Sequence, residues 1–342
     1  MKVGIVAGGT LGHIMPGMIL AKKLSEKHDV IYITSKKDLR FDIFENSVFL
    51  KKVYFVDVEG INKKAYKNIN TFIKGVKGLK EINKIIKEEQ VDLLIGMGGA
   101  ISGIAMVACG KKVKKIIHEQ NKVMGFANKS VLRFVDKILL TFDIDLKDKL
   151  KRKSVVVSNP CLFTSVPNTI KDKNNILITS GSNGAQEIND LAIELINSNC
   201  LMNYHITLVT GKKYYDEVIS KINKTPNVDI YPFVNNMNEY IYKSSIVISR
   251  AGSATIFESL ALDTVPLLFP SSNVTNNHQY YNALEIESSG MGEIIDKDTV
   301  LKKIHKVTNN YQEYILNIKR YKKHYDLDKI IKIIEEVGLS KS

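Results

Sequence analysis

Cysteine is scarce in this sequence: its 342 residues include three, Cys109, Cys161 and Cys200. The number is odd, and no two of them have the spacing of metal ligands. This pattern disfavours both a disulfide-bonded secreted protein and a cysteine-based metal site. A reduced, cytosolic compartment is expected.

Long apolar runs are absent as well. No stretch of about 18 uninterrupted apolar residues occurs, so we expect no transmembrane helix. The opening residues MKVGIVAGGT lack the basic stretch, the long apolar run and the small-residue cleavage site of a signal peptide. Any contact with a membrane is therefore expected to be peripheral.

Several common catalytic motifs are also missing. No glycine loop is followed by the Lys-Ser or Lys-Thr of a P-loop ATPase, and no Gly-x-Ser-x-Gly elbow supports a serine hydrolase. GGTLGH (8–13) does not fit G-x-G-x-x-G, and no acidic residue ends the strand expected at 30–34, which disfavours a dinucleotide oxidoreductase. No Asp-x-Asp motif of the nucleotide-sugar type occurs. DIDLKD (143–148) is interpreted as charged surface, so no metal site is expected.

Positive charge is in excess, with 49 Lys+Arg against 36 Asp+Glu and a formal net charge of +13. The excess favours an anionic partner, although a lysine-rich compositional bias explains it equally well. The lysines are scattered and no nucleic-acid-binding motif is recognisable, so nucleic acid ranks last among such partners.

The chain is long enough for two domains, and short apolar runs alternate with helical segments, as in parallel, doubly wound sheets. A proline-containing segment at 158–173 breaks the pattern and is interpreted as a linker. Two similar α/β halves are thus predicted, with ligands bound between them at the carboxyl ends of the strands. Strands are expected at 3–7, 30–34, 93–95, 116–117 and 138–140, then at 175–181, 205–211, 245–249 and 265–270.

Three glycine loops each follow an expected strand and precede an expected helix: residues 8–13, 96–103 and 180–185. Glycine lets a phosphate approach the backbone, and the helix start offers free N–H groups and the positive end of a dipole. One such loop is as often a packing turn as a ligand site. Three loops divided between two halves favour phosphate-bearing ligands.

Polar residues gather at other expected strand ends. His13 closes the first glycine loop and suits a general base, although a lone histidine is more often a cap or an exposed side chain. HEQN (118–121) lies at an expected strand end, where binding groups are placed, but it reads equally as a polar turn. NNHQYYNA (276–283) opens an expected helix, either with His278 and Gln279 as candidate donors or as a solvated helix start. RAGSATIFESLA (250–261) is more informative, because a helix start suits a diphosphate and Glu258, one turn further, suits a ribose diol.

An apolar stripe with helical spacing and many lysines runs through residues 66–87. An ordinary core-facing helix is the commoner explanation of such a stripe. A peripheral membrane patch is the functional one. Gly75 and Gly78 are expected to weaken the middle of this helix. The patch residues are Ile69, Phe72, Ile73, Val76 and Leu79, with Lys74 and Lys77.

In their order along nearly the whole chain, these motifs resemble those of the MurG family of UDP-N-acetylglucosamine:N-acetylmuramyl-(pentapeptide) pyrophosphoryl-undecaprenol N-acetylglucosaminyltransferases. HEQN followed by G-x-A-N-K is the most distinctive match. The resemblance implies an α/β fold of two Rossmann-like, doubly wound parallel-sheet domains in the GT-B arrangement. A cleft would lie between the domains. The last helix, about 315–337, would pack on the first domain. The matching motifs are GGTLGHIMPG, IGMGGAISG, HEQNKVMGFANK, SNP, SGSNGAQEIN, RAGSATIFE and HQYYNA.

The resemblance also implies an activity. Such an enzyme transfers N-acetylglucosamine from UDP-GlcNAc to the MurNAc of undecaprenyl-pyrophosphoryl-MurNAc-pentapeptide (lipid I), with inversion and without a metal or cofactor, giving lipid II for peptidoglycan synthesis. This step serves cell-wall biogenesis, cell shape and cell division. The expected location is the cytoplasmic face of a bacterial membrane. Expected partners are UDP-GlcNAc, lipid I, the anionic membrane surface and other cell-wall synthesis proteins, without nucleic acid.

Site residues follow from the same resemblance. The first domain, 1–160, would hold the acceptor and the membrane contact, with His13 as the candidate base; the second, 161–342, would hold the donor. The acceptor-diphosphate residues are Gly9, Gly98, Gly99 and Ser102. The donor residues are Thr10, Gly12, Asn121, Ser182, Asn183, Arg250, Gly252, Ala254, Thr255, Glu258, His278 and Gln279.

The sequence departs from the family pattern at three places. Cys161 and Leu162 stand where an arginine usually follows the SNP motif. The second strand leads to Arg40 and not to a glutamate, and Ala100 replaces a tyrosine. These changes leave open a divergent GT-B enzyme with another lipid-linked acceptor. Two other functions are possible. A UDP-GlcNAc 2-epimerase-like enzyme would need catalytic carboxylates in the cleft and would have no lipid-binding patch. A regulator that only binds a sugar nucleotide would show no turnover.

Overall fold

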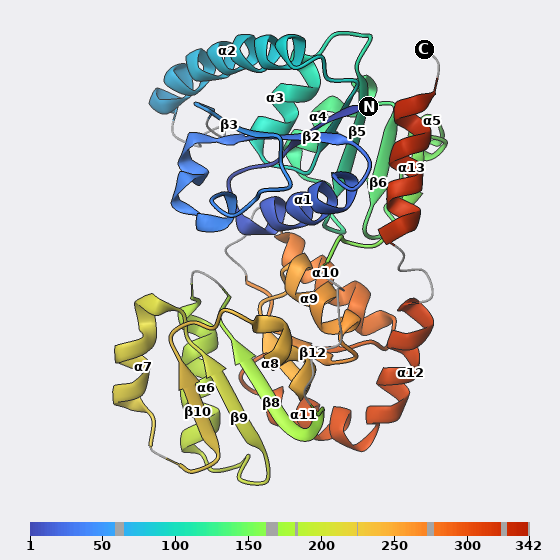
Figure 1. Ribbon diagram of the computed structural model, residues 1–342. Coiled ribbons are helices and arrows are strands. Elements are labelled where there is room, and N and C mark those ends of the chain that lie inside the picture. Colours follow the sequence, from blue (N-terminus) through green and yellow to red (C-terminus); the bar gives the residue numbers. More distant parts are fainter. Residues whose placement is uncertain are drawn as a thin grey trace. The chain divides into compact units, whose positions relative to one another are not determined.

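In the computed structural model the chain forms two compact units (Figure 1). Unit 1 comprises Met1–Cys161 with Tyr325–Ser342, and unit 2 comprises Leu162–His324. Within residues 65–74 the structure describes the helical backbone alone. The residues that the structure describes are 1–58, 65–161, 170–181, 184–223, 225–271, 277–322 and 327–340.

Unit 1 is built on a seven-stranded parallel sheet with the order β3-β2-β1-β4-β5-β6-β7. The strand order reverses between β1 and β4, which are hydrogen-bonded neighbours. Such a reversal opens a crevice beyond the carboxyl ends of the strands. The strands are β1 (Lys2–Val6), β2 (Asp29–Ser35), β3 (Lys52–Val56), β4 (Leu93–Gly96), β5 (Lys114–Glu119), β6 (Lys137–Leu140) and β7 (Ser154–Val156).

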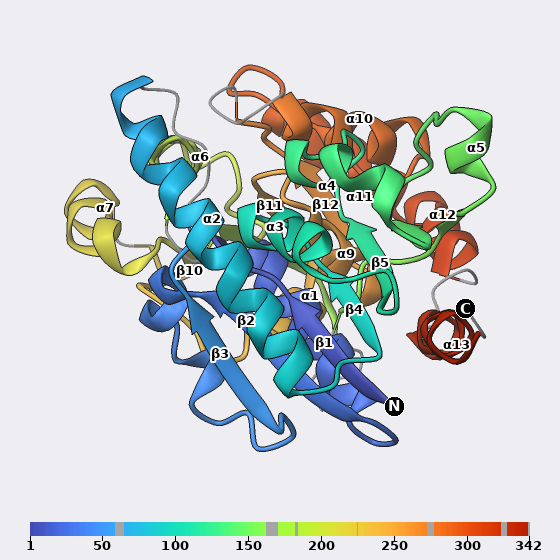
Figure 2. The same cartoon turned by 90° about the horizontal axis from the view of Figure 1, so that it is seen from above.

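Helices cover both faces of this sheet. Figure 2 shows α2 and α3 lying over one of these faces. One apolar cluster joins the strands to α1 and α13, and a second joins them to α2, α3 and α4. Alternating residues of a strand enter opposite clusters, as Val3 and Val6 do. The helical elements are α1 (Leu11–Leu24), η1 (Lys36–Arg40), η2 (Asp42–Phe44), α2 (Ala65–Glu88), α3 (Ala100–Ala108), α4 (Phe126–Val131), η3 (Leu132–Phe134), α5 (Asp148–Lys151) and α13 (Leu327–Leu339).

The last helix of the chain belongs to unit 1. Ile330, Ile331 and Ile334 of α13 are buried in the same cluster as Val3 and Ile14. These three isoleucines lie at helical spacing, so they form one apolar stripe along α13. The last helix predicted at about 315–337 corresponds to two helices, α12 (Tyr311–Lys322) in unit 2 and α13 in unit 1.

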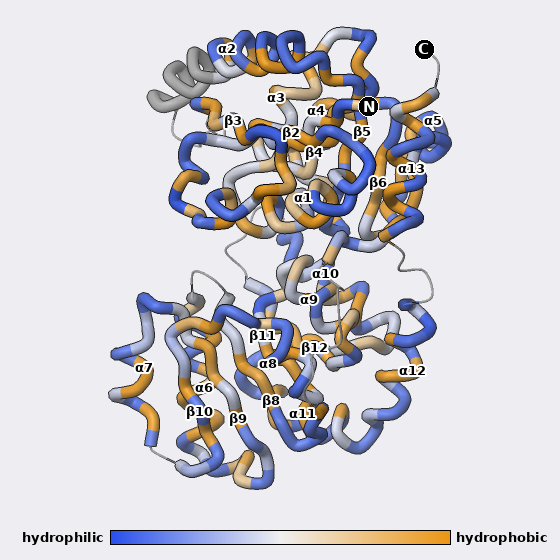
Figure 3. Tube along the Cα trace, viewed as in Figure 1, coloured by the Kyte–Doolittle hydropathy of each residue, from blue (hydrophilic) through white to orange (hydrophobic). Residues whose placement is uncertain are grey.

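Unit 2 repeats the design with a six-stranded parallel sheet in the order β10-β9-β8-β11-β12-β13. Apolar residues follow the strands and the inner faces of the helices in each unit (Figure 3). The strands are β8 (Asp172–Thr179), β9 (His205–Val209), β10 (Val228–Tyr231), β11 (Ser244–Ser249), β12 (Val265–Leu268) and β13 (Glu293–Ile294). The helices are α6 (Gln186–Asn197), η4 (Lys212–Tyr214), α7 (Tyr215–Lys221), α8 (Met237–Lys243), α9 (Ser253–Ala261), α10 (His278–Ser288), α11 (Val300–Asn309) and α12 (Tyr311–Lys322).

The segment predicted as a linker, 158–173, is only partly one. Ser158, Asn159 and Cys161 are buried, because the chain still packs on unit 1 after β7. At the other end, the first residue of β8 is Asp172. Residues 162–169 lie outside the described part of the chain.

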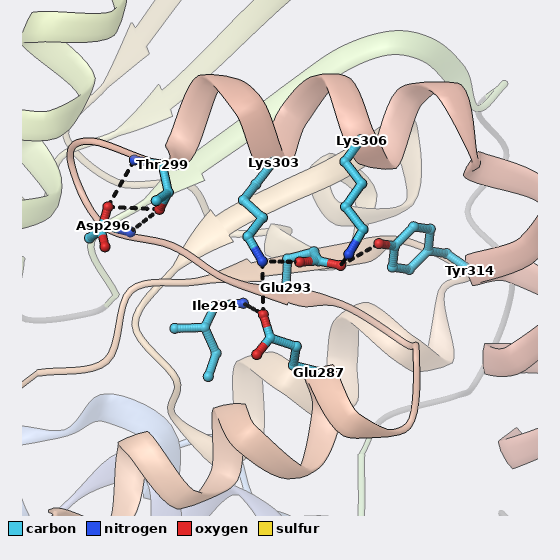
Figure 4. Close-up of polar contacts among 8 residues, drawn as sticks. All are labelled: Glu287, Glu293, Ile294, Asp296, Thr299, Lys303, Lys306 and Tyr314. Carbon is cyan, nitrogen blue, oxygen red and sulfur yellow. Dashed lines mark hydrogen bonds and ion pairs between the residues drawn. The ribbon is translucent and has the colours of Figure 1, made fainter.

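A buried carboxylate holds the two-residue edge strand β13 in place (Figure 4). Glu293, 3% exposed, accepts hydrogen bonds from Lys303, from Lys306 at 2.5 Å and from Tyr314. Lys303 also reaches Glu287 of α10 at 3.0 Å. Burial raises the pKa of Glu293, but these hydrogen bonds outweigh it and leave the pKa below its ordinary value. The network joins β13 to α10, α11 and α12.

Replacing Glu293 by alanine should lower the free energy of unfolding by about 3 kcal/mol, because two lysines and a tyrosine lose their shared acceptor. The loss should shrink below the ordinary pKa of a glutamate, since a depressed pKa stabilises the folded state only while the group is ionised. Denaturant titrations at pH 7 and pH 4 measure both effects. Exposed Glu313→Ala is the matched control. A Glu293 variant as stable as that control would contradict the assignment.

Candidate active site

Two glycine loops of unit 1 touch through their backbones. They follow β1 and β4, which are adjacent strands, so both lie at the same edge of the sheet. Gly99 has φ +80° and packs so closely on the Gly8 carbonyl that no side chain fits between them. Gly9 and Gly98 also have positive φ, +92° and +110°. Glycine is therefore required here by backbone shape, as phosphate-binding loops require it.

His13, the predicted base, lies against the second glycine loop. It is the third residue of α1 and is partly exposed. A Cβ on Gly98 would come within 2.5 Å of its Nδ1 atom, so the imidazole ring covers the Gly98 backbone. The structure thus brings together three residues that belong to separate sequence motifs: His13, Gly98 and Gly99.

Asp38 braces the first glycine loop and was missed by the sequence argument, which searched for an acidic residue at the end of β2 itself. It is fully buried just beyond that strand. Its carboxylate accepts the Gly9 N–H at 3.0 and 3.1 Å and the Thr34 hydroxyl at 2.8 Å. Arg40 donates to the Gly9 carbonyl at 3.1 Å. The Gly9 amide is therefore engaged within the protein in this structure.

The polar run at the end of β5 serves mainly to hold its own loop. Buried Glu119 accepts the backbone N–H of Asn121 at 3.0 Å and of Gly125 at 2.9 Å, and the Asn128 amide at 3.0 Å. Gln120 donates to the Met97 carbonyl at 3.1 Å and so ties this loop to the β4 loop. Glu119 and Gln120 therefore shape the site, and partly buried Asn121 is the residue of HEQN predicted to reach the donor.

His118 lies fully buried beneath this loop. Its Nε2 atom lies 3.4 Å from the Ser158 carbonyl and 3.3 Å from the Thr141 hydroxyl. Burial is the main cause that lowers the pKa of His118 to about 4; the Ser158 hydrogen bond acts to raise the pKa, and nearby His13 adds a smaller lowering. His118 is therefore neutral at pH 7. Ser102, a predicted acceptor residue, is also fully buried, against Gly96.

In unit 2 the corresponding loop follows β8. Gly181 and Gly184 both have φ +74°, the conformation that glycine adopts without strain. Buried Asn189 of α6 accepts from the Ser180 hydroxyl at 2.6 Å and donates to the Thr210 carbonyl at 3.1 Å, which joins the loops after β8 and β9. The predicted donor residues Ser182 and Asn183 lie outside the described residues.

The loop after β11 opens directly into α9, with Gly252 at the N-cap position. Ala254 and Thr255 lie in the first turn, so free backbone N–H groups point out of the helix at this strand end. Glu258 follows one turn later. The residue is partly exposed, yet burial raises the pKa of its carboxyl group to about 7. A carboxylate kept from water is suited to receive hydroxyl donors.

Arg250 precedes that turn and is held at several points. Its Nη1 donates to the Phe269 carbonyl at 3.3 Å, and its guanidinium lies 5.2 Å from the centre of the Phe269 ring. It also forms an ion pair with Glu187 of α6. Burial lowers the pKa of Arg250 from its ordinary value.

The predicted sugar contacts open α10. His278 is its first residue, and Gln279 accepts the Ser271 backbone N–H at 2.9 Å. Buried Asn282 donates to the Ala251 carbonyl at 3.3 Å. The helix start is thereby fastened to the loop that carries Arg250. Sequence reasoning missed Asn282, which HQYYNA contains.

Helix α2 contains the residues of the predicted membrane patch. It is one continuous helix from Ala65 to Glu88, and Gly78 packs on Val58 where a Cβ would lie 2.5 Å from a methyl group. Gly78 thus permits close packing, and the helix continues through it. Leu79 packs against the core, whereas Val76, 43% exposed, and Lys77 face outward. The side chains of Ile69, Phe72, Ile73 and Lys74 lie outside the described residues.

Among the residues that the structure describes, no three or more His, Cys, Asp or Glu side chains are grouped to hold a metal ion. No described helix is long and apolar enough to cross a membrane.

Solved structures define the class of protein. The fold matches the crystal structure of Acinetobacter baumannii MurG with a TM-score of 0.76 and 22% identity, over 98% of this chain and 99% of that one. It matches the glycotransferase of kitacinnamycin with a TM-score of 0.74 and 14% identity, over 98% of each chain. Two Rossmann-like units with glycine loops at the strand ends thus define a GT-B glycosyltransferase fold.

Sequence comparisons narrow the class. Residues 3–140 match the glycosyltransferase family 28 N-terminal domain, and residues 175–336 match its C-terminal domain. The UDP-N-acetylglucosamine--N-acetylmuramyl-(pentapeptide) pyrophosphoryl-undecaprenol N-acetylglucosamine transferase of Thermoanaerobacter sp. (strain X514) is 33% identical over 90% of this chain and 89% of its own length. The enzyme of that name from Bacillus cytotoxicus is 31% identical over 93% and 91%. The chain belongs to this family, the MurG family, as its motifs predicted.

Replacing Asp38 by alanine should lower the free energy of unfolding by about 3 kcal/mol, because the Gly9 and Ser35 N–H groups and the Thr34 hydroxyl lose a buried acceptor. Urea titration followed by circular dichroism measures the change. Asp42→Ala, an exposed site in the next turn, should change stability by less than about 0.5 kcal/mol. Equal effects of the two substitutions would show that Asp38 does not brace the loop.

Replacing Glu258 by glutamine should stabilise the protein at pH 8 by about 2 kcal/mol. A pKa of about 7 in the folded state lies above the ordinary value, so this carboxyl contributes stability at low pH that is lost as the pH rises through 7. The gain should shrink as the pH falls and vanish only below about 4.5, the ordinary value, where the carboxyl is protonated in both the folded and the unfolded state. Thermal unfolding of Glu258→Gln and of exposed Glu194→Gln across pH 4–8 tests this. A gain independent of pH would argue against a raised pKa.

Proposed function

We propose that this chain transfers N-acetylglucosamine from UDP-GlcNAc to the MurNAc of lipid I, giving lipid II for peptidoglycan synthesis. The observation that carries the proposal is the identity of 31–33%, over about nine-tenths of both chains, to enzymes named for this reaction. These relatives match the chain along nearly its whole length. The proposed donor domain and the proposed acceptor domain therefore both have counterparts in the same enzymes.

Unit 2 supplies the donor site in this proposal. The N-terminus of α9, at Gly252, Ala254 and Thr255, receives the diphosphate together with Arg250. Glu258 accepts two hydroxyl hydrogen bonds from the ribose. Ser182, Asn183, His278 and Gln279 contact the rest of the nucleotide sugar, with Thr10, Gly12 and Asn121 contributed by unit 1. The support is that the first turn of α9 offers free N–H groups and that the Glu258 carboxyl is shielded from water.

Unit 1 supplies the acceptor site. The glycine loops at Gly9 and at Gly98 and Gly99 receive the acceptor diphosphate. Ser102, which was also predicted to bind it, is fully buried and does not contact it in this proposal. His13 takes the proton of the attacking hydroxyl. Its support is positional: the imidazole lies on the loop that would hold the acceptor and remains partly exposed. General-base assistance requires a side chain within hydrogen-bond reach of the attacking group.

The chemistry is a single displacement. The acceptor hydroxyl attacks the anomeric carbon from the side opposite UDP, the bond to the UDP oxygen breaks, and the configuration inverts. His13 receives the hydroxyl proton, and the diphosphate leaves with the electron pair. Arg250 and the α9 N–H groups stabilise the charge that builds on that diphosphate, the role that a metal fills in other enzymes. No metal or other cofactor takes part in this scheme.

Location follows from the acceptor. A lipid-linked substrate confines the enzyme to a membrane surface, here the cytoplasmic face, as a peripheral protein. Exposed Val76 and Lys77 of α2 support this placement from within the described residues, because an apolar side chain beside a lysine suits an anionic interface. Other cell-wall synthesis proteins acting on the same lipid are expected neighbours.

Purified protein, labelled UDP-GlcNAc and a short-chain lipid I analogue should give a disaccharide-lipid product in the presence of EDTA. His13→Ala should lower turnover by roughly 10²- to 10⁴-fold while leaving UDP affinity nearly unchanged. Exposed His305→Ala is the control and should retain full turnover. UDP-GlcNAc binding without product would redirect the search to other acceptors. Equal loss of turnover and UDP affinity in His13→Ala would remove His13 as the base.

A further inference from the structure

The Glu187 carboxylate lies beside two positively charged features, Arg250 after β11 and the N-terminus of α6 after β8. Glu187, the second residue of α6, forms an ion pair with Arg250, and the two loops are adjacent because β8 pairs with β11. Glu187 is also the acidic residue in the first turn of α6, directly after the glycine loop. A carboxylate at this position cancels the attraction of the helix N-terminus for an anion.

Arg250 does not need Glu187 to be positioned. The Phe269 carbonyl and the Phe269 ring hold its guanidinium from a separate strand end. Its side chain is 17% exposed, against 47% for Glu187. A guanidinium so far removed from water requires a counter-anion, and in the unliganded protein Glu187 provides it. Glu187, by contrast, can rotate into water at little cost, because an exposed ion pair is weakly held.

We propose that Glu187 is a built-in competitor for the donor diphosphate, which must displace it from Arg250 in order to bind. The inference rests on the proposed function, which places that diphosphate on Arg250 and the N-terminus of α9. Binding then exchanges one ion pair for another, so part of the gain from Arg250 is offset and UDP leaves more readily after transfer. No proton or covalent bond changes in this exchange.

The alternative role is support, in which Glu187 orients Arg250 toward the phosphates. The two roles predict opposite signs. Removing a competitor tightens UDP binding, whereas removing a support weakens it. Charge repulsion between the Glu187 carboxylate and a diphosphate on the same guanidinium favours competition, and the independent anchoring of Arg250 by Phe269 removes the need for support.

Calorimetric titration of the full chain with UDP tests the proposal. Glu187→Gln should lower the UDP dissociation constant roughly five- to twentyfold at low salt, and the gain should shrink at 0.5 M salt, where such charges are screened. Glu194→Gln, an exposed glutamate on the same helix, should bind UDP as the wild type does. In an Arg250→Gln background, removing Glu187 should have little effect, because the two residues act as a pair.

Each outcome decides one question. Unchanged or weaker UDP binding by a folded Glu187→Gln variant overturns the competitor role. Glu187→Asp, which keeps the charge on a shorter side chain, should fall between wild type and Glu187→Gln, and it provides the comparison should the glutamine variant unfold. If the wild type binds UDP and Glu187→Gln binds it with the same dissociation constant, this inference fails and the donor assignment stands. Wild-type protein that binds no UDP defeats the donor assignment and this inference together.

Discussion

The parallel pairing of β1 with β4, and of β8 with β11, brings together the loops that carry most of the candidate functional residues. Each pair marks the point where the strand order of its sheet reverses, so the loops that follow the two strands are neighbours. In unit 1 this brings His13 onto the loop of Gly98, and in unit 2 it brings Arg250 to α6. Residues more than 60 positions apart share one site because two hydrogen-bonded strands end together.

Loops at such an edge carry polar backbone groups that the sheet cannot satisfy, and buried side chains satisfy them here. Asp38 and Gln120 do so in unit 1, and Asn189 and Asn282 in unit 2. Each spans two segments, so the loops hold their shape before any ligand arrives. Preorganised amides of this kind stabilise developing charge without the cost of reorganisation. The matching design of the two units therefore serves rigidity as much as recognition.

The sequence allowed the nine strong strands and the glycine loops to be predicted, because buried parallel strands leave continuous apolar runs. Edge strands escaped: β3 and β10 are only partly buried, and β7 and β13 have three and two residues. A short or half-exposed strand leaves no apolar run to recognise. Pairing across the sheet, not local composition, makes these segments strands.

The motifs predicted the neighbourhood of the site better than the roles of single residues. HEQN supplied one predicted ligand, Asn121; in the structure Glu119 and Gln120 hold the loops and His118 is buried. Asp38 was overlooked because the sequence argument looked for an acidic residue at the end of the strand, whereas Asp38 lies three residues beyond β2 and reaches the backbone of Gly9. Gly78 was expected to weaken its helix, and its small size allows α2 to approach Val58. Each of these distinctions depends on contacts between distant segments.

The position of α13 in unit 1 has a consequence for biosynthesis. Unit 1 is assembled from both ends of the chain, with the whole of unit 2 inserted between them. On the ribosome, Ile330, Ile331 and Ile334 emerge only after the whole of unit 2, so the apolar face against which they pack stays uncovered while unit 2 is made. Unit 2 is continuous in sequence and can complete its core earlier. The second half of this protein is therefore able to finish folding before the first.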